Sequence, residues 1–195
     1  GISIKKTYRG INNFSTKDEN NMILVGFVAF LDPPKEEVKQ VLEKLSQKGI
    51  DVKILTGDAL SSTRKICQLV GLENTNSLTG EEVAKMSDKE LLDVIDDIKI
   101  FARLNPIQKN RIVNLYKEKG HVVGYMGDGV NDALSLKSAD VGISVNDATD
   151  IAKEASDIII LERSLEVIYD GVMEGRRVYG NIIKFVKMSL ASDFG

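Results

Sequence analysis

The sequence predicts an α/β fold in which helices cover both faces of a parallel sheet. From residue 22 onward, short apolar segments alternate with segments of helical periodicity. The apolar segments are continuous, which is typical of strands that are buried on both faces. Two of them lead into a Gly-Asp pair, at Gly57-Asp58 and at Gly127-Asp128. Both pairs are therefore expected at the carboxyl edge of the sheet, where open α/β folds bind ligands.

The predicted strands are short and bounded by turn residues. In chain order they lie at Met22–Leu31, Val52–Leu55, Lys99–Leu104, Val122–Met126, Val141–Val145 and Ile158–Leu161. The first is the longest apolar run, but it is too short to span a bilayer.

Start and stop signals place the helices between these strands. Asp32-Pro33-Pro34 supplies a capping residue and first-turn prolines for a helix at Lys35–Lys48, which Gly49 ends. Ser87 and Glu90 have the spacing of a capping box ahead of a further helix. The remaining helices are predicted at Thr63–Val70, from Asn105-Pro106 to Gly120, at 130–138, at 148–155, and from about 164 to the end.

The composition is that of a folded domain without a strong charge bias. Apolar residues make up 43% of the 195 residues, charged residues make up 28%, and the formal net charge is −3. This balance gives no indication of a nucleic-acid partner. The single cysteine, Cys67, excludes an intramolecular disulfide and a cysteine zinc cluster. Its apolar neighbours indicate a small buried side chain, in keeping with a reducing compartment.

The strongest chemical signal is the turn from Gly127 to Asp132, which reads Gly-Asp-Gly-Val-Asn-Asp. Asp128 and Asp132 lie at the start of a predicted helix, so both carboxylates can face one point. They would repel unless a hard cation lay between them, and Mg²⁺ suits carboxylate and phosphate oxygens. Gly127 and Gly129 let the backbone turn sharply and let a phosphate approach closely. Asn131 adds an amide donor, and the start of the helix adds partial positive charge. The alternative is a pair of helix-capping aspartates without a ligand.

Two weaker signals also point to phosphate. Thr56-Gly57-Asp58 follows a strand and can offer a hydroxyl and a backbone N–H, although it could equally be a plain strand-to-helix turn. Lys109 lies in the first turn of a predicted helix, where its charge opposes the helix dipole. A nearby anion would explain this position, and so would simple exposure to solvent.

Four motifs in this order resemble those of the P-type cation-transporting ATPases, within the haloacid dehalogenase-like superfamily. They are Asp32-Pro33-Pro34-Lys35, Thr56-Gly57-Asp58, Pro106-Ile107-Gln108-Lys109 and the turn from Gly127 to Asp132. The resemblance extends over about residues 22–195 and is greatest to the magnesium-importing branch, in segments such as Gly142–Val145 and Asp150–Lys153. It implies a Rossmann-like parallel sheet.

The resemblance also implies roles for single residues. Thr56, Lys109 and Asp128 would be catalytic, and Asp128 and Asp132 would hold Mg²⁺. Lys109 would neutralise the transferred phosphoryl group, because such catalysis is mainly positioning and charge stabilisation. The implied phosphate- and nucleotide-binding residues are Thr56, Gly57, Asp58, Lys109, Asn131 and Asp32, of which Asp58 and Asp32 would lie nearer the nucleotide and the hinge.

The sequence departs from the family pattern in two places. These ATPases form an aspartyl-phosphate on a strand that reads Asp-Lys-Thr-Gly-Thr, and this sequence contains no such segment. Asp32 follows an apolar run, but Pro34 offers neither a carboxylate nor a hydroxyl, so Asp32 is not expected to be the nucleophile. The sheet is therefore expected to be incomplete, with its first strand absent and two edges unpaired. Leu134-Ser135 replaces the usual Pro-Ala, which puts the local turn in doubt more than the ligands.

The implied organisation has three parts. Residues 1–21 would be a linker or the remnant of a nucleotide-binding domain, residues 22–163 the phosphorylation domain, and residues 164–195 a helix leading to a membrane stalk. The alternative for the last part is an ordinary amphipathic surface helix, in which Arg176 and Lys184 flank apolar residues.

The expected parent is a membrane pump that hydrolyses ATP with Mg²⁺ and moves a cation, for which the resemblance implies magnesium. This chain would lie on the cytosolic side and would act with the actuator, nucleotide-binding and transmembrane domains of its parent. By itself it is expected to be soluble, monomeric and inactive. The alternatives are a calcium or other cation pump, a stand-alone phosphatase of the same superfamily, and a non-catalytic module that binds magnesium and phosphate.

Overall fold

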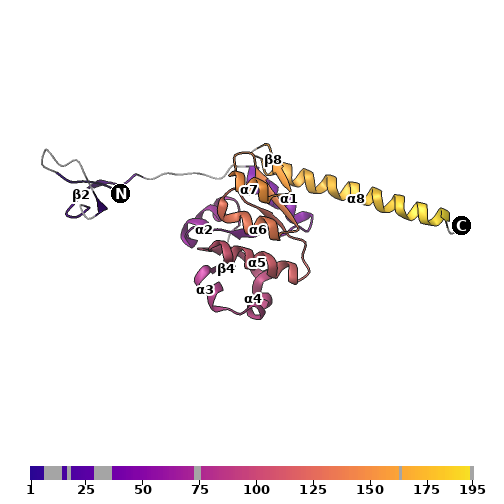
Figure 1. The fold of residues 1–195 in the computed structure, drawn as a ribbon, viewed down its shortest axis with the longest axis horizontal. Coiled ribbons are helices and arrows are strands. Elements are labelled where there is room, and N and C mark those ends of the chain that lie inside the picture. Colours follow the sequence, from indigo (N-terminus) through magenta and orange to yellow (C-terminus); the bar gives the residue numbers. More distant parts are fainter. Residues whose placement is uncertain (7–14, 17–18, 29–36, 73–75, 163, 194–195) are drawn as a thin grey trace. The chain divides into compact units, whose positions relative to one another are not determined.

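The structure is a computed structural model that describes residues 1–6, 15–16, 19–28, 37–72, 76–162 and 164–193. The chain divides into two compact units, Gly1–Pro33 and Pro34–Gly195. A two-stranded sheet forms in the first unit, and parallel strands with flanking helices form in the second (Figure 1).

In the first unit, β1 (Ile2–Ile4) pairs antiparallel with β2 (Ile23–Gly26). The prediction of a buried strand at Met22–Leu31 in the parallel sheet is wrong, because β2 is shorter, pairs with β1, and leaves Val25 61% exposed. An apolar run indicates a strand but does not identify its partner. Asp32 and the rest of the Asp32–Lys35 motif lie outside the described residues.

In the second unit, the parallel sheet predicted from the sequence is confirmed as two three-stranded parallel sheets. The first has the order β3-β5-β4 and the second has the order β6-β7-β8. The strands are β3 (Ile54–Leu55), β4 (Asn76–Thr79), β5 (Ile98–Ala102), β6 (Gly124–Met126), β7 (Val141–Val145) and β8 (Ile158–Ile160). Within the described chain, β3 and β6 each have one hydrogen-bonded neighbour and are therefore edge strands.

Helices cover both faces of the first parallel sheet, as predicted. Ile100 and Ala102 of β5 pack on one face with Cys67 of α2, whereas Phe101 packs on the other face with α3, α4 and α5. Cys67 is 1% exposed, so its expected burial is confirmed. Val113 of α5 belongs to the core of the second sheet, so this helix joins the two cores.

The helices begin and end near the predicted signals. Asn105 caps α5 by accepting a hydrogen bond from the Gln108 backbone at 2.9 Å, and the Gln108 side chain accepts one from the Asn105 backbone at 3.0 Å. The predicted capping box of Ser87 and Glu90 starts α4 in the same way. The helix bounds are α1 (Glu37–Gln47), α2 (Leu60–Leu69), α3 (Gly80–Lys85), α4 (Asp88–Val94), α5 (Pro106–Glu118), α6 (Ala133–Ser138), α7 (Asp150–Ala155) and α8 (Glu166–Asp193).

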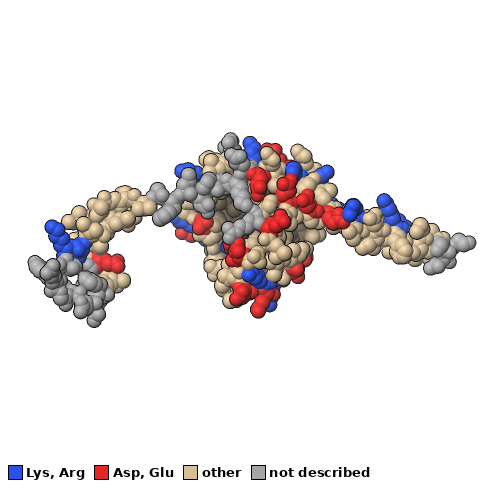
Figure 2. Space-filling view, turned by 90° about the horizontal axis from the view of Figure 1, so that it is seen from above, with Lys and Arg blue, Asp and Glu red and all other residues tan. Residues whose placement is uncertain are grey.

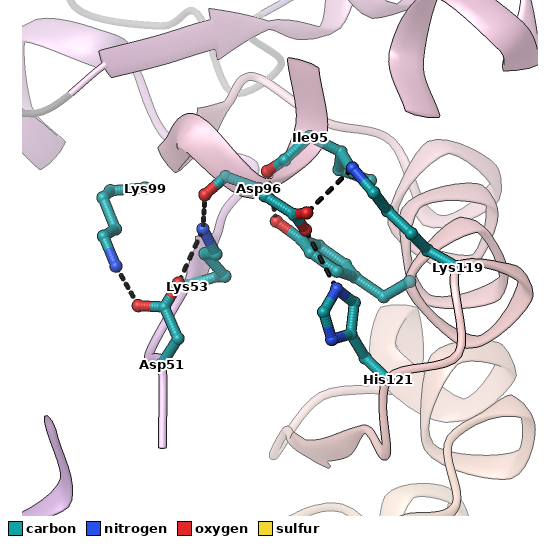
Figure 3. A network of polar contacts seen from close by, with 8 residues as sticks. Asp51, Lys53, Ile95, Asp96, Lys99, Lys119 and His121 are labelled. Atoms are coloured by element: carbon teal, nitrogen blue, oxygen red, sulfur yellow. Dashed lines mark hydrogen bonds and ion pairs between the residues drawn. The ribbon is translucent and has the colours of Figure 1, made fainter. Parts of the chain in front are cut away.

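A polar network fixes the end of the first sheet where β3 and β5 begin (Figure 3). Asp96, in the short 3₁₀ helix η2 (Ile95–Asp97), accepts a hydrogen bond from Lys119 at 2.8 Å and contacts His121 at 3.0 Å. Lys53 pairs with Asp51 at 2.9 Å and also donates to the Asp96 backbone oxygen. These contacts join the C-terminal end of α5 to the amino ends of the strands, opposite the edge where the Gly-Asp pairs lie.

The first turns of α8 pack against α1. Lys44 pairs with Glu166 at 2.5 Å, and Arg176 donates to the Lys48 backbone oxygen at 2.9 Å. Towards its C-terminus, α8 exposes apolar side chains, among them Phe185 at 65% and Met188 at 69%. In the described part of the chain, no helix has the length and apolar character that crossing a bilayer requires. Figure 2 shows basic and acidic side chains interspersed over the visible face of the second unit.

Candidate functional site

The turn after β6 is held by its own backbone. Gly127 donates to the Ile143 carbonyl at 3.1 Å, which continues the β6-β7 ladder, and the Asp128 carbonyl accepts from the Thr149 backbone at 3.0 Å. Residue 127 has to be glycine, because a Cβ there would lie 2.5 Å from the Cβ of Asp132. The turn then enters the 3₁₀ helix η3 (Val130–Asp132) and α6. The Asp128 side chain is exposed at the carboxyl edge of the sheet.

Asp132 lies at the centre of the site and is only 8% exposed. Its Oδ1 accepts hydrogen bonds from Lys109 Nζ and from the Tyr125 hydroxyl, both at 2.8 Å. Its Oδ2 accepts a longer hydrogen bond from the Gly129 backbone N–H at 3.3 Å. Burial alone would raise the pKa of Asp132, but the hydrogen bonds from Lys109 and Tyr125 outweigh it and lower the pKa. Asp132 is therefore ionised at neutral pH.

Lys109 is brought to Asp132 by the first turn of α5. The two side chains are 13% and 12% exposed, so their ion pair is largely shielded from water. The sequence left open why a lysine stands at the start of this helix. The carboxylate of Asp132 is an anion within contact distance, and it accounts for that position.

The second predicted phosphate site is the turn Thr56-Gly57-Asp58. Asp58 donates its backbone N–H to Thr56 Oγ1 at 3.1 Å, and the Thr56 hydroxyl lies 3.2 Å from Asp58 Oδ2. The Thr56 carbonyl accepts from the Leu104 backbone at 2.9 Å, and the Asp58 carbonyl accepts from the Arg103 backbone at 2.9 Å. This turn and Lys109 therefore share one support, since Leu104 leads directly into the cap of α5.

The structure brings some of the predicted site residues together and leaves others apart. Lys109 contacts Asp132, whereas the described residues show no hydrogen bond or ion pair between the Thr56–Asp58 turn and residues 127–132. Asn131 is exposed in η3, and among the described residues it forms no hydrogen bond with Lys109. Asp32 lies outside the described residues.

The donor set fits Mg²⁺ only as a site that a phosphate and water would complete. Among the described residues, no three His, Cys, Asp or Glu side chains gather around a point. Asp132 Oδ1 already accepts hydrogen bonds from Lys109 and Tyr125. Its Oδ2 accepts the Gly129 N–H at the start of η3, so the helix-capping alternative holds for this oxygen. Asp128 remains as an exposed carboxylate, and Mg²⁺ is commonly bound by one or two carboxylates with waters and substrate phosphates.

The contact of Tyr125 with Asp132 and the backbone conformation of Arg103 were not predicted from the sequence. Tyr125 lies in an apolar strand and is 8% exposed, so its sequence context indicates only a core residue. The available signal was that buried tyrosine hydroxyls usually find a hydrogen-bond partner. Burial and the Asp132 carboxylate raise the pKa of Tyr125, so its hydroxyl is protonated and donates. Arg103 adopts a φ of +53° beside the Thr56–Asp58 turn, which the sequence does not reveal.

Leu134 and Ser135, which replace the usual Pro-Ala, lie in the regular helix α6. The helix α6 begins directly after Asp132 and runs through both residues. Leu134 is 55% exposed and Ser135 is fully buried, so the first faces solvent and the second joins the core side of the helix.

Known proteins are similar to this chain in sequence and in fold. Residues 6–140 match the sequence model of a hydrolase family, the haloacid dehalogenase-like hydrolases. A solved structure of the catalytic domain of the CPx-ATPase CopB-B superposes with a TM-score of 0.53 at 27% identity, over 69% of this chain and 44% of that chain. The chain therefore belongs to the haloacid dehalogenase-like hydrolase family.

The chain is also similar to P-type ATPases along most of its length. It is 50% identical over 183 residues to a magnesium-transporting ATPase, P-type 1, from Escherichia coli, which covers 94% of this chain and 20% of that protein. It is 51% identical over 178 residues to a protein of the same name from Salmonella typhimurium, covering 91% of this chain and 20% of that protein. A calcium-transporting ATPase from Bacillus subtilis is 36% identical over 180 residues, or 91% of this chain and 20% of that protein.

The chain thus spans about a fifth of the length of the curated relatives that it matches. The resemblance to P-type ATPases, and to their magnesium-transporting members in particular, is confirmed by these identities.

Proposed function

We propose that this chain is the phosphoryl-handling part of an ATP-driven cation pump, with magnesium as the transported ion. The observation that carries the proposal is the shielded Lys109–Asp132 pair at the carboxyl edge of the sheet, beside the exposed carboxylate of Asp128. An ammonium and a carboxylate placed at a sheet edge are the two charges that a phosphoryl group and its Mg²⁺ require. The names of the relatives from Escherichia coli and Salmonella typhimurium support magnesium over another cation.

Each side chain has a distinct role in this proposal. Thr56 and Gly57 hold the phosphoryl oxygens through a hydroxyl and a backbone N–H, and Lys109 stabilises the negative charge that develops on them. Asp128 would hold Mg²⁺, which neutralises phosphate charge when it is bound. Asp132 orients Lys109 and would support Asp128 in holding Mg²⁺.

Three further residues contact the substrate in this proposal. Asn131 donates its amide to phosphate, and Asp58 and Asp32 take part in binding the nucleotide. The ATP itself is bound with the help of that domain. The parent is a membrane protein, and this part of it works on the cytosolic side together with actuator and transmembrane domains.

The nucleophile of the pump belongs to an Asp-Lys-Thr-Gly-Thr segment that this sequence does not contain. We therefore expect that this 195-residue chain neither hydrolyses ATP nor becomes phosphorylated. Incubation with γ-labelled ATP followed by acid precipitation tests this directly. Acid-stable label on the chain would contradict the proposal and would favour a self-sufficient enzyme, such as a stand-alone phosphatase of the superfamily.

The binding part of the proposal is tested by calorimetric titration with Mg²⁺ and with inorganic phosphate. Asp128→Ala is expected to weaken Mg²⁺ binding at least about tenfold, because the exposed carboxylate provides the charged protein ligand. Asp170→Ala is the matched control, since Asp170 is an exposed aspartate on α8. Equal Mg²⁺ affinity in the wild type and in Asp128→Ala would show that residues 127–132 do not form the Mg²⁺ site.

A further inference from the structure

Tyr125 contacts the charged centre of the site, but the roles proposed above do not include it. It lies in the middle of β6, is 8% exposed, and packs with Val113 and Leu136. Its hydroxyl nevertheless reaches the charged centre of the site, donating to Asp132 Oδ1 at 2.8 Å. A phenylalanine would fill the same core position, so packing does not explain the hydroxyl.

The hydroxyl of Tyr125 shares one carboxylate oxygen with Lys109. Both donors lie 2.8 Å from Asp132 Oδ1, whereas among the described residues Oδ2 accepts only the longer hydrogen bond from the Gly129 N–H, at 3.3 Å. A buried carboxylate that loses a donor is costly, because its desolvation is then uncompensated. The number of donors that Asp132 keeps therefore determines how readily Lys109 can turn towards another anion.

We infer that Tyr125 is a positioning residue that makes Lys109 available to phosphate. When a phosphoryl group draws Lys109 Nζ away, Tyr125 and Gly129 still satisfy Asp132 and keep it in place. Without the hydroxyl, Asp132 would depend on Lys109 and one long hydrogen bond, and it would hold the lysine more firmly. This inference rests on the proposed function of Lys109 as the phosphate-binding cation.

The first test compares phosphate and Mg²⁺ affinities in Tyr125→Phe and in a matched control. Tyr125→Phe is expected to weaken phosphate binding about tenfold, of the order of a hydrogen bond to a charged group, and to leave Mg²⁺ affinity unchanged. The control is Tyr116→Phe, because Tyr116 is also 8% exposed and donates its hydroxyl at 2.6 Å, but to the Ile95 carbonyl at the other end of α5. Tyr116→Phe should leave both affinities unchanged.

A structural role for Tyr125 gives a different result. If the hydroxyl only stabilised the turn, Tyr125→Phe would weaken Mg²⁺ and phosphate binding together, and this would overturn the inference. Unchanged phosphate affinity would overturn it as well. In a Lys109→Gln background, adding Tyr125→Phe should cause no further loss of phosphate affinity, since Tyr125 acts through Lys109. A full additional loss would show that it acts by another route.

A second measurement needs no ligand. Lys109→Gln should shift the unfolding equilibrium constant at least about fivefold more in Tyr125→Phe than in the wild type, because Asp132 then loses its last strong donor. Equal shifts in both backgrounds would contradict the inference. Failure of the proposed function looks different again: Asp128→Ala would leave Mg²⁺ binding intact and Lys109→Gln would leave phosphate binding intact, whatever Tyr125→Phe does.

Discussion

Asp132 shows how a buried charge can be kept at low cost. It is 8% exposed, yet Lys109, Tyr125 and the Gly129 backbone all donate to it. These hydrogen bonds compensate the desolvation that would otherwise neutralise the carboxylate. The negative charge of Asp132 in turn holds Lys109 at the edge of the sheet. The positions of Asp132 and Lys109 therefore depend on the same carboxylate.

The lowered pKa of Asp132 predicts an acid-dependent contribution to stability. The folded chain binds a proton to this carboxylate at lower pH than the unfolded chain does. Its stabilisation is therefore present above the ordinary aspartate pKa of about 3.9 and is lost as pH falls through the lower folded pKa. Asp132→Asn should cost about 1–3 kcal/mol at pH 7 and progressively less below about pH 4.

Urea unfolding at a series of pH values measures this dependence. Asp170→Asn is the control, because Asp170 is exposed on α8. A cost of Asp132→Asn that stayed constant from neutral to acid pH would mean that the folded pKa of Asp132 is not lowered.

Candidate site residues could be predicted from the sequence where the spacing of residue types along the chain indicated them. The turn from Gly127 to Asp132 and the position of Lys109 stand out because their residue types are unusual for those places. The contact between Lys109 and Asp132 could not be derived from spacing, since it depends on how α5 packs beside β6. Tyr125 was missed for the same reason, because only the fold brings its hydroxyl to Asp132.

At the scale of elements, the capping box at the start of α5 positions Lys109. Asn105 and Gln108 exchange hydrogen bonds at 2.9 and 3.0 Å, and Lys109 follows directly. Such boxes are local in sequence, which is why α4 and α5 could be predicted. The strand β4 and the helix α3 were not predicted, since Asn76–Thr79 contains a single apolar residue and α3 is short. They form because β4 pairs with β5 and α3 packs on the core.

Removing this cap should affect both stability and binding. Asn105→Ala is expected to cost about 1 kcal/mol of stability and to weaken phosphate binding, because the first turn of α5 carries Lys109. The matched control is Ser87→Ala in the equivalent box of α4, where Ser87 and Glu90 exchange hydrogen bonds at 2.8 and 3.3 Å. The control should cost similar stability with unchanged phosphate affinity. Equal phosphate affinity in the two variants would show that the cap of α5 does not affect phosphate binding.

The turn after β6 should not tolerate a side chain at residue 127. A Cβ there would lie 2.5 Å from Asp132 Cβ, so Gly127→Ala should cost about 1–3 kcal/mol and displace Asp132 from Lys109. Gly171→Ala is the control, because a Cβ at this position of α8 meets nothing within 4 Å. Alanine in a helix should be neutral or stabilising by about 1 kcal/mol. Urea unfolding measures both, and a stable Gly127→Ala would contradict the close contact.

At the scale of the molecule, the parallel strands of the second unit form two separate sheets. The edge strands β3 and β6 belong to separate sheets, yet Leu55 and Val123 each pack against the same two core clusters. The class of fold was predictable because strands and helices alternate regularly. The partner of the first apolar run was not, because pairing between β1 and β2 depends on residues distant in sequence and leaves no periodic signal.

The division into two units predicts that the second folds without the first. All buried apolar residues of the described chain lie between Val41 and Ile160, within Pro34–Gly195. An isolated two-stranded antiparallel sheet such as β1-β2 is at best marginally stable on its own. Removal of residues 1–33 should therefore change the free energy of unfolding by less than about 0.5 kcal/mol, within the usual range of surface changes. Val41 itself is only 1% exposed, so Val41→Ala opens a cavity in the core and provides the contrasting loss of about 1–3 kcal/mol. A truncated chain that unfolds at a clearly lower urea concentration would show that residues 1–33 contribute to the core of the second unit.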